Sequence, residues 1–223
     1  MNGQPPQIPA QVTLRPIGTP LPLGFIGLFL ATTAFSCLQL QWLAIDQQPT
    51  MAISVLAFTV PAQLLAAVFG FLARDPVAGT GMAILAGTWA ATSIATLTAA
   101  PGAKTPGLGV VLLAAAVALL IPAAAATTKL VAAAVMALSS MRFAVTGIAE
   151  LTGAAGWATA AGWVGLLLAA AALYAAFAFE IEAARHHTIL PLLRRGAGRA
   201  AVHASLDDQI QDLPHEPGIR RQL

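Results

Sequence analysis

The chain has 223 residues, of which 58% are hydrophobic and only 9% are charged, and its mean hydropathy is +0.79. A water-soluble domain would lack enough polar side chains to cover its surface, so this composition excludes one and predicts a chain surrounded by lipid. The formal net charge is +2 and most basic residues follow residue 184, so no nucleic-acid partner is expected. The single cysteine, Cys37, excludes an intramolecular disulfide and every multi-cysteine metal site.

Apolar stretches in chain order predict six transmembrane helices. Each is close to the roughly 20 residues that cross the hydrocarbon of a bilayer, and turn-forming or charged residues separate them. The predicted spans are 22–43, 51–73, 80–100, 107–126, 129–149 and 157–180. No segment alternates with period two as a barrel strand would, so the fold class is all-α. We expect a six-helix transmembrane domain over residues 22–181, an amino-terminal tail over 1–21 and a largely flexible carboxy-terminal tail over 182–223.

The distribution of basic residues predicts the orientation of these helices. With six spans, both tails and two of the loops share one side of the membrane, and the opposite side has only Lys104. The basic residues on the shared side are Arg15, Arg74, Lys129, Arg185, Arg194, Arg195, Arg199, Arg220 and Arg221. Cytoplasmic segments carry an excess of Lys and Arg, so we expect a multi-pass protein of the cell (plasma) membrane with both termini in the cytoplasm.

Polar side chains form stripes at helical spacing on the first, third and fifth predicted helices. A stripe that faced lipid would be costly, so each should face inward, either around a path or against neighbouring helices as hydrogen-bonded contacts. For Ser and Thr the second alternative is the simpler one, because their hydroxyls can bond to the carbonyl one turn back. The stripes are Thr32, Ser36 and Gln39; Thr88, Thr92 and Thr96; and Ser139, Arg142, Thr146 and Glu150.

Arg142 is the most informative member of these stripes. An arginine near the middle of a span costs about 2.5 to 3.5 kcal/mol and is tolerated mainly when it is paired or faces water. The candidate partners are Glu150 two turns away, Glu180 on another helix, or a carboxylate that is the cargo. A guanidinium binds a carboxylate with two parallel hydrogen bonds, which suits a structural ion pair and a transport role equally.

Several short motifs resemble one family of membrane transporters. The first span opens with Thr19-Pro20-Leu21-Pro22-Leu23-Gly24-Phe25, which resembles the Asn-Pro-Ala-Pro-Leu-Gly-Leu signature of the acetate uptake transporter family, the succinate-acetate permeases. Further matches follow in the same order along the chain: Ala62-Gln63, Trp89, Gly162-Trp163-Val164-Gly165-Leu166, Tyr174 and Thr188-Ile189-Leu190-Pro191. The matches cover nearly the whole apolar region, and the family is our preferred identification.

The resemblance implies a six-helix bundle that assembles as a homo-hexamer in the bilayer, with a path through each protomer for acetate and related short carboxylates such as succinate. The family's hydrophobic constriction corresponds to Leu28, Leu85 and either Ala137 or Leu138, of which we prefer Leu138. Each precedes a polar stripe residue by about one turn, so we expect the path to be lined by these leucines with Thr32, Ser36, Thr88, Thr92 and Arg142.

Two departures from the family pattern change what is expected of the path. The aromatic constriction residues are replaced by aliphatic ones, which suggests a wider gate. The family's Trp-Glu-Phe at the end of the second helix becomes Phe69-Gly70-Phe71, which removes a carboxylate that could take part in proton coupling. Proton symport and passive passage therefore both stay open, with protons a candidate partner.

Other functions remain as alternatives. A channel for another small solute, such as ammonia or a neutral weak acid, would have a similar composition, and so would a membrane scaffold or sensor. No motif for phosphate, dinucleotide or metal binding is present, so we expect no enzyme activity, cofactor or metal.

Overall fold

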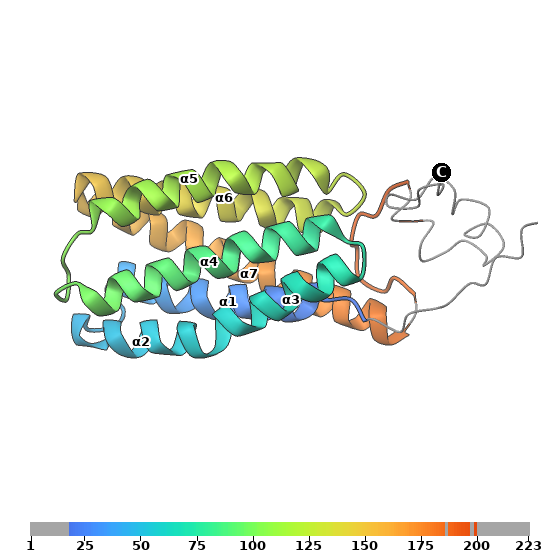
Figure 1. Cartoon of the computed structure of the whole chain (residues 1–223), viewed down its shortest axis with the longest axis horizontal. Helices are drawn as coiled ribbons and strands as arrows, with labels where there is room; N and C mark the ends of the chain where they lie inside the picture. The colour runs from blue at the N-terminus through green and yellow to red at the C-terminus, as the bar shows by residue number, and fades with distance from the viewer. Residues whose placement is uncertain (1–17, 186, 197–198, 200–223) are drawn as a thin grey trace, which may run out of the picture.

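The computed structural model describes residues 18–185, 187–196 and 199, and these residues form a bundle of helices without a strand (Figure 1). Most of the two predicted tails, residues 1–17 and 200–223, lies outside the described residues. Six helical segments are long and apolar enough to cross a membrane, which confirms the predicted spans and the all-α fold class. In chain order the elements are α1 (Leu21–Gln39), the 3-10 turn η1 (Ile45–Gln47), α2 (Gln48–Ser54), the π turn η2 (Val55–Thr59), α3 (Val60–Leu72), α4 (Pro76–Thr98), α5 (Pro106–Ala125), α6 (Leu130–Thr152) and α7 (Ala155–Arg185).

The ends of these helices follow from local chemistry. The carboxylate of Asp75 accepts a hydrogen bond from the backbone N–H of Ala78 at 3.1 Å and so caps α4, which begins with Pro76. Gly153 ends α6 with a φ of 68°, a left-handed conformation that favours glycine. The last helix, α7, continues to Arg185, beyond the predicted end at residue 180.

The second span is one rod built from η1, α2, η2 and α3, and its helix is irregular next to Pro61. Proline has no N–H and its ring clashes with the carbonyl one turn earlier, so the helix widens into the π turn Val55–Thr59 at this point. The hydroxyl of Thr59 donates to the carbonyl of Gly27 at 2.9 Å, and the amide of Gln63 donates to the carbonyl of Gly24 at 3.4 Å. These two hydrogen bonds join the irregular turn and α3 to α1.

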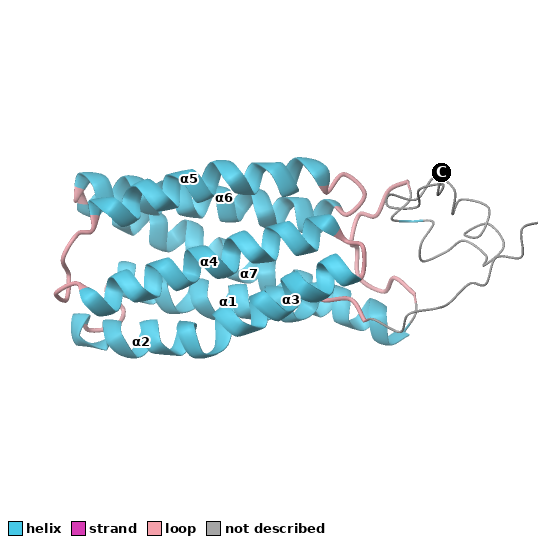
Figure 2. Ribbon diagram, in the orientation of Figure 1, coloured by secondary structure: helices cyan, strands magenta, loops and turns pink. Residues whose placement is uncertain are grey.

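The helices close into a ring. Around the bundle, α1 packs against α3, α3 against α4, α4 against α5, α5 against α6, α6 against α7, and α7 against α1 again. Figure 2 shows the same rods lying nearly side by side along the long axis of the bundle. A closed ring of helices has an inner face, on which side chains from α1, α4 and α6 can meet.

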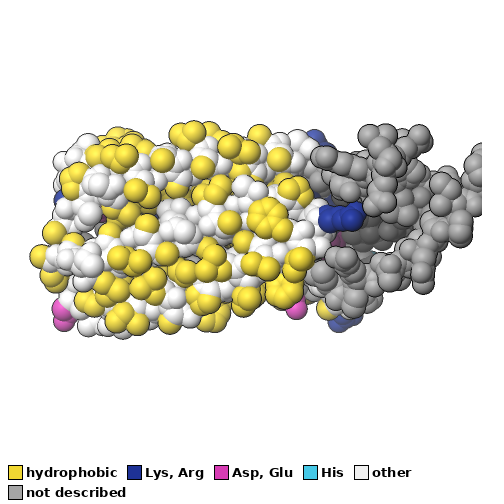
Figure 3. Space-filling view, in the orientation of Figure 1, with side chains coloured by type: hydrophobic (Ala, Val, Ile, Leu, Met, Phe, Trp, Pro, Cys, Tyr) yellow, Lys and Arg dark blue, Asp and Glu magenta, His cyan; other side chains and the backbone are white. Residues whose placement is uncertain are grey.

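The outer wall and the two ends of the bundle differ in character. Large apolar side chains cover the lateral surface, where Val117 is 67% and Ile121 is 70% exposed, as expected for a wall that faces lipid (Figure 3). Residue 18 and the end of α7 share one end, here called the tail end, which contains Lys129. The opposite end, here called the vestibule end, contains the α4–α5 loop with Lys104.

Glycines allow a close helix crossing between α5 and α6. Where α5 crosses α6, a Cβ on Gly109 would lie 2.9 Å from the carbonyl oxygen of Gly147, and a Cβ on Gly147 would lie 2.8 Å from the carbonyl oxygen of Gly109. These neighbours are backbone atoms, which cannot move aside as a side chain can. Small residues let membrane helices approach in this way, where no hydrophobic force drives them together.

We predict that Gly147→Ala lowers the thermal midpoint of the purified protein in detergent, because the added methyl group forces α5 and α6 apart. Overpacking of this kind costs about 1–3 kcal/mol. The matched control is Gly87→Ala in α4, an exposed helical glycine whose Cβ would have no neighbour within 4 Å. Gly87→Ala should leave the midpoint unchanged or raise it, because alanine is the better helix former. Equal midpoints for the two variants would contradict the tight crossing.

Candidate functional site

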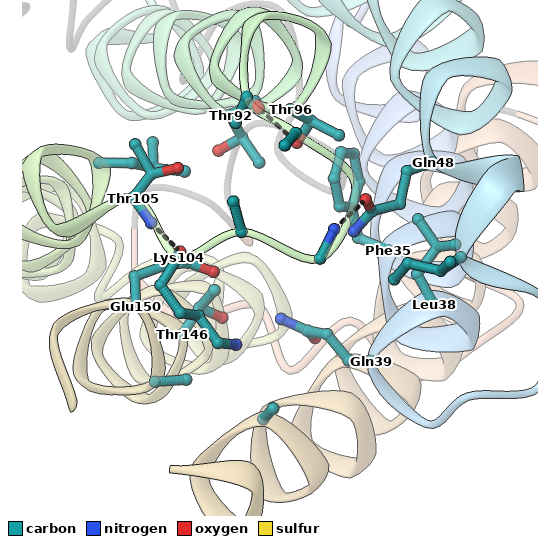
Figure 4. A pocket seen from close by; sticks show the side chains of 18 of the residues that line it. Phe35, Leu38, Gln39, Gln48, Thr92, Thr96, Lys104, Thr105, Thr146 and Glu150 are labelled. Carbon is teal, nitrogen blue, oxygen red and sulfur yellow. Dashed lines mark hydrogen bonds between the residues drawn. The ribbon is translucent and has the colours of Figure 1, made fainter. Parts of the chain in front are cut away.

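A cavity of about 260 Å³, here called the vestibule, opens at the vestibule end of the bundle (Figure 4). Its walls come from α1, η1, α2, α4, α6, the starts of α5 and α7, and the α4–α5 loop. Its polar lining residues are Gln39, Gln41, Gln48, Thr92, Thr96, Lys104, Thr105, Thr146 and Glu150. The cavity therefore joins the predicted stripes of three different helices around one space.

Side chains from two helices fix the α4–α5 loop at the rim of the vestibule. Gln48 of α2 accepts a hydrogen bond from the backbone N–H of Gly102 at 3.0 Å. The carboxylate of Glu150, from α6, accepts one from the N–H of Thr105 at 2.9 Å, just before α5 begins (Figure 4). Positive partial charge at a helix start stabilises a carboxylate there, so Glu150 is held at the wall of the cavity.

Three aromatic side chains meet in the bundle next to the vestibule. The ring centroid of Trp89 on α4 lies 5.6 Å from that of Phe35 on α1 and 5.5 Å from that of Phe143 on α6. All three are buried, and Phe35 also lines the vestibule. We call this cluster the aromatic floor. The sequence analysis did not predict this cluster, although each ring lies within one turn of a polar stripe residue on α1, α4 or α6.

Arg142 lies beside this floor and is only 2% exposed. Its guanidinium donates a hydrogen bond to the hydroxyl of Thr146, a lining residue of the vestibule, and that hydroxyl donates to the carbonyl of Arg142 at 2.8 Å. No carboxylate of a described residue lies within 4.0 Å of the guanidinium. Of the two protein partners considered for it, Glu150 is held at Thr105 and Glu180 is exposed.

Buried polar atoms without a hydrogen bond follow α1 next to Arg142. They are the hydroxyls of Thr32 and Ser36, the side-chain oxygen of Gln39 and the Nε of Arg142 itself. Ser36 and Arg142 meet at Gly165 of α7, where a Cβ would lie 2.6 Å from the arginine Nε and closer still to the serine hydroxyl. Buried polar groups are normally paired, so these atoms are candidate contacts for a ligand.

The stripe hydroxyls of α4 behave differently, although the buried hydroxyl of Ser93 on the same helix has no hydrogen bond. Thr92 donates to the carbonyl of Thr88 at 2.8 Å, and Thr88 donates to that of Ile84 at 2.7 Å. Ser139 on α6 also bonds within its own helix, to the carbonyl of Val135 at 2.8 Å. These hydroxyls therefore donate their protons to carbonyls of their own helices, which is the simpler of the two alternatives predicted from the sequence. Their oxygens can still accept a hydrogen bond, and Thr92 lines the vestibule (Figure 4).

The leucines expected at the constriction lie deeper in the bundle than the aromatic floor. Leu28 on α1 and Leu85 on α4 are completely buried, and Leu138 on α6 is partly buried against the same core. Ala137, the alternative to Leu138, is exposed. Together with the buried Met82 and Met136, these side chains fill the interior on the tail side of the floor. Their part in a path stays a prediction.

The residues of the signature motif pack the start of α1. Pro20, Pro22 and Gly24 are buried, whereas Thr19 and Leu23 are exposed. A Cβ on Gly24 would meet the side chain of Met82, so this glycine lets α1 and α4 approach closely. The motif is therefore explained by helix packing at the tail end, and none of its residues lines the vestibule.

The segment that follows α7, residues 187–196, folds back over the tail end. The guanidinium of Arg194 forms an ion pair with the carboxylate of Glu182 and lies 5.6 Å from the ring centroid of Phe179. The N–H of Arg195 donates to the carbonyl of Thr128 in the α5–α6 loop at 3.0 Å. Leu192 is buried in the core. This return segment and the core beneath it close the tail end, whereas the vestibule end is open.

We predict that Gly165→Ala lowers the thermal midpoint, because its methyl group would collide with both Ser36 and Arg142, at a cost of about 1–3 kcal/mol. Ser36→Ala removes the nearer neighbour, so the double variant should lose less stability than the sum of the two single variants. Thermal midpoints of the three variants in detergent measure this coupling. If the losses of stability in the two single variants simply add in the double variant, Gly165 is not needed to make room for Ser36 and Arg142.

Comparison with known proteins identifies a relative by structure. No family model and no curated protein sequence matches the chain. Among solved structures, the chain is similar to the bacterial acetate channel SatP, with 25% sequence identity and a TM-score of 0.66 over 78% of this chain and 98% of that one. That protein is a channel, and the match runs over almost its whole length. The comparison thus confirms the predicted resemblance, and this chain shares the fold of an acetate transporter family.

Proposed function

We propose that the protein is a membrane transporter or channel for acetate and related short-chain carboxylates, which cross through the interior of each protomer. The observation that supports this most strongly is Arg142, a buried cation with no described carboxylate within 4.0 Å, next to the floor of an open vestibule. The fold shared with an acetate channel supports the same conclusion.

The electrostatic argument begins with the cost of burying a charge. A buried guanidinium without a counter-ion is strongly unfavourable, because it loses its hydration and gains no attraction in return. A small carboxylate from the vestibule would supply the missing negative charge, and the planar guanidinium can bind it with two parallel hydrogen bonds. The unpaired hydroxyls of Ser36 and Thr32 would replace part of the hydration that the anion loses.

The vestibule is the mouth of the proposed path, and the aromatic floor is its first gate. Apolar constrictions can gate by excluding water, so the rings of Phe35, Trp89 and Phe143 must separate before cargo passes Arg142. Leu28, Leu85 and Leu138 form the second constriction in this proposal. Thr88 and Thr92 would offer oxygen atoms along the α4 side.

We propose the following setting for this path. The tail end faces the cytoplasm, because the described basic residues Arg74, Lys129 and Arg185 lie there, whereas Lys104 lies at the vestibule end. The chain resides in the cell membrane, with residues 22–181 as its transmembrane domain and both tails inside. The family resemblance supports a homo-hexamer with one path per protomer. Succinate is the candidate larger cargo.

We predict that Arg142→Gln lowers the uptake of labelled acetate into proteoliposomes by about tenfold or more, since hydrogen bonds to a charged group contribute about 1.5–3 kcal/mol. Arg195→Gln is the matched control, because its side chain is exposed at the tail end and should leave uptake unchanged. Uptake should be measured at two pH values, with and without a proton gradient. Unchanged flux in Arg142→Gln with a lower thermal midpoint would assign the arginine a structural role alone.

We also predict that Leu85→Trp slows uptake of succinate more than uptake of acetate, because a larger side chain narrows the second constriction. The ratio of the two initial rates in proteoliposomes is the measurement. Leu85 is completely buried, so Leu85→Phe serves as a milder variant if the tryptophan lowers the yield of folded protein. An equal loss of uptake rate for acetate and succinate would show that Leu85 does not line the path.

A further inference from the structure

A buried carboxylate holds the return segment against the last helix. Glu182 on α7 is only 7% exposed, and it accepts hydrogen bonds from the hydroxyl of Thr188 at 2.6 Å and from the Nε of Arg194 at 3.0 Å. The same carboxylate forms the ion pair with Arg194. Thr188 and Arg194 both belong to the return segment, so Glu182 ties this segment to α7 at two points.

The far end of the return segment joins the α5–α6 loop. The N–H of Arg195 donates to the carbonyl of Thr128. Next to this hydrogen bond, Arg194 and Lys129 face each other as an isolated antiparallel bridge. The side chain of Lys129 forms an ion pair with Asp75, which caps α4. The return segment thus links the end of α7 to the start of α6 and, through Lys129, to the start of α4 (Figure 1).

The return segment lies over the core that adjoins the proposed path. Leu192 is 1% exposed and belongs to the same core cluster as Phe25. The guanidinium of Arg194 lies over the ring of Phe179 on α7, and that ring centroid is 6.1 Å from the one of Phe25 on α1. Phe25 precedes Leu28 by three residues, so the two side chains share one face of α1. The contacts of the return segment therefore end about one helical turn from the second constriction.

The backbone of the return segment is strained between its two anchors. Leu193 follows the buried Leu192 and precedes the paired Arg194, and its φ is 50°. This left-handed conformation is unfavourable for leucine, because its Cβ crowds the backbone. The side chain of Leu193 is 59% exposed, so its own burial does not offset the strain. Such strain persists only where surrounding contacts impose it, and it is common in segments that switch between two arrangements.

The contacts that hold the return segment also differ from those that hold the helices together. Helices α5 and α6 meet at glycines in a surrounding of lipid, where no other partner can replace the contact. The ion pairs and hydrogen bonds of the return segment lie at the end of the bundle, where water can replace them. Release of this segment therefore requires no separation of the packed helices.

We propose that the return segment is a releasable closure of the tail end, which blocks the path while Glu182 binds Arg194 and opens it when this contact breaks. This inference rests on the proposed function and adds a control point at the opposite end of the bundle from the vestibule. It assigns Glu182 and Arg194 a role in setting the rate of transport, without contact with the cargo.

The first test breaks the contact at Glu182. Glu182→Gln removes the charge that holds Arg194, so we expect the initial rate of labelled acetate uptake into proteoliposomes to rise by about fivefold or more, the lower range of coupling between two protein states. The matched control is Glu180→Gln, which removes an exposed carboxylate of the same helix with no described ion pair and should leave the rate unchanged. Labelled sucrose should stay outside in both variants, which excludes a general leak.

The second test locks and unlocks the return segment in one protein sample. Lys129 and Arg194 form a non-hydrogen-bonded antiparallel pair, because the flanking residues supply the hydrogen bond. The Cα atoms of such a pair are about 4.5 Å apart, which is within the range of a disulfide. The double variant Lys129→Cys and Arg194→Cys is made with Cys37→Ala, which removes the sole native cysteine. Oxidation then closes a cross-link that dithiothreitol opens.

The double variant loses both ion pairs, so its reduced form should transport rapidly, and oxidation should lower its uptake rate by about fivefold or more. The same folded sample is compared before and after reduction, so a difference in folding does not enter. The two single variants, Lys129→Cys and Arg194→Cys with Cys37→Ala, are the matched controls, because neither can form the cross-link within a protomer. Their uptake rates should not respond to the oxidant.

The outcomes separate this inference from the proposed function. Equal uptake rates in the cross-linked and reduced double variant would overturn the closure and leave carboxylate transport in place. A double variant that does not cross-link would also overturn it, and so would monodisperse Glu182→Gln protein with no faster uptake than Glu180→Gln. If Glu182→Gln is not monodisperse, the double variant decides. Absence of labelled uptake in every protein, the unmodified one included, would refute the proposed function itself.

Discussion

The burial of one guanidinium inside a lipid-covered bundle is the constraint on which the rest of this structure depends. Lipid offers no hydrogen bonds, so the helices place their polar side chains on the inner face of a closed ring. Within that ring, Thr146 accepts one hydrogen bond from Arg142, and Gly165 leaves room for its side chain. The ring therefore keeps a buried positive charge next to an open cavity.

Much of the fold was predictable from the sequence, because crossing a bilayer requires long apolar helices and the chain contains six of them. The inward orientation of Arg142 was also predictable, since a charge that faced lipid would be too costly. Exact helix ends were less predictable: α7 continues to Arg185 because nothing in Glu180 or Glu182 prevents a helix from extending past the hydrocarbon.

The candidate site was predictable only in part. The three striped helices do surround one cavity, but the partner of Glu150 is a backbone N–H of the α4–α5 loop, and loop conformation is not encoded in helical spacing. The aromatic floor was missed because Phe35, Trp89 and Phe143 are apolar, and an apolar residue in a span faces lipid or core equally well by composition. Spacing identified the helices, and only their packing showed which rings meet.

The return segment has a mechanical consequence. Arg195 is bonded to Thr128, and Arg194 is paired with Glu182, so the end of α7 is tied to the loop that precedes α6. The hydroxyl of Tyr174 adds a third attachment, to the carbonyl of Pro191 at 2.9 Å. A tilt of α7 must therefore drag the start of α6 with it. The return segment thus fastens the last helix to the helix before it at the tail end, in addition to their direct packing.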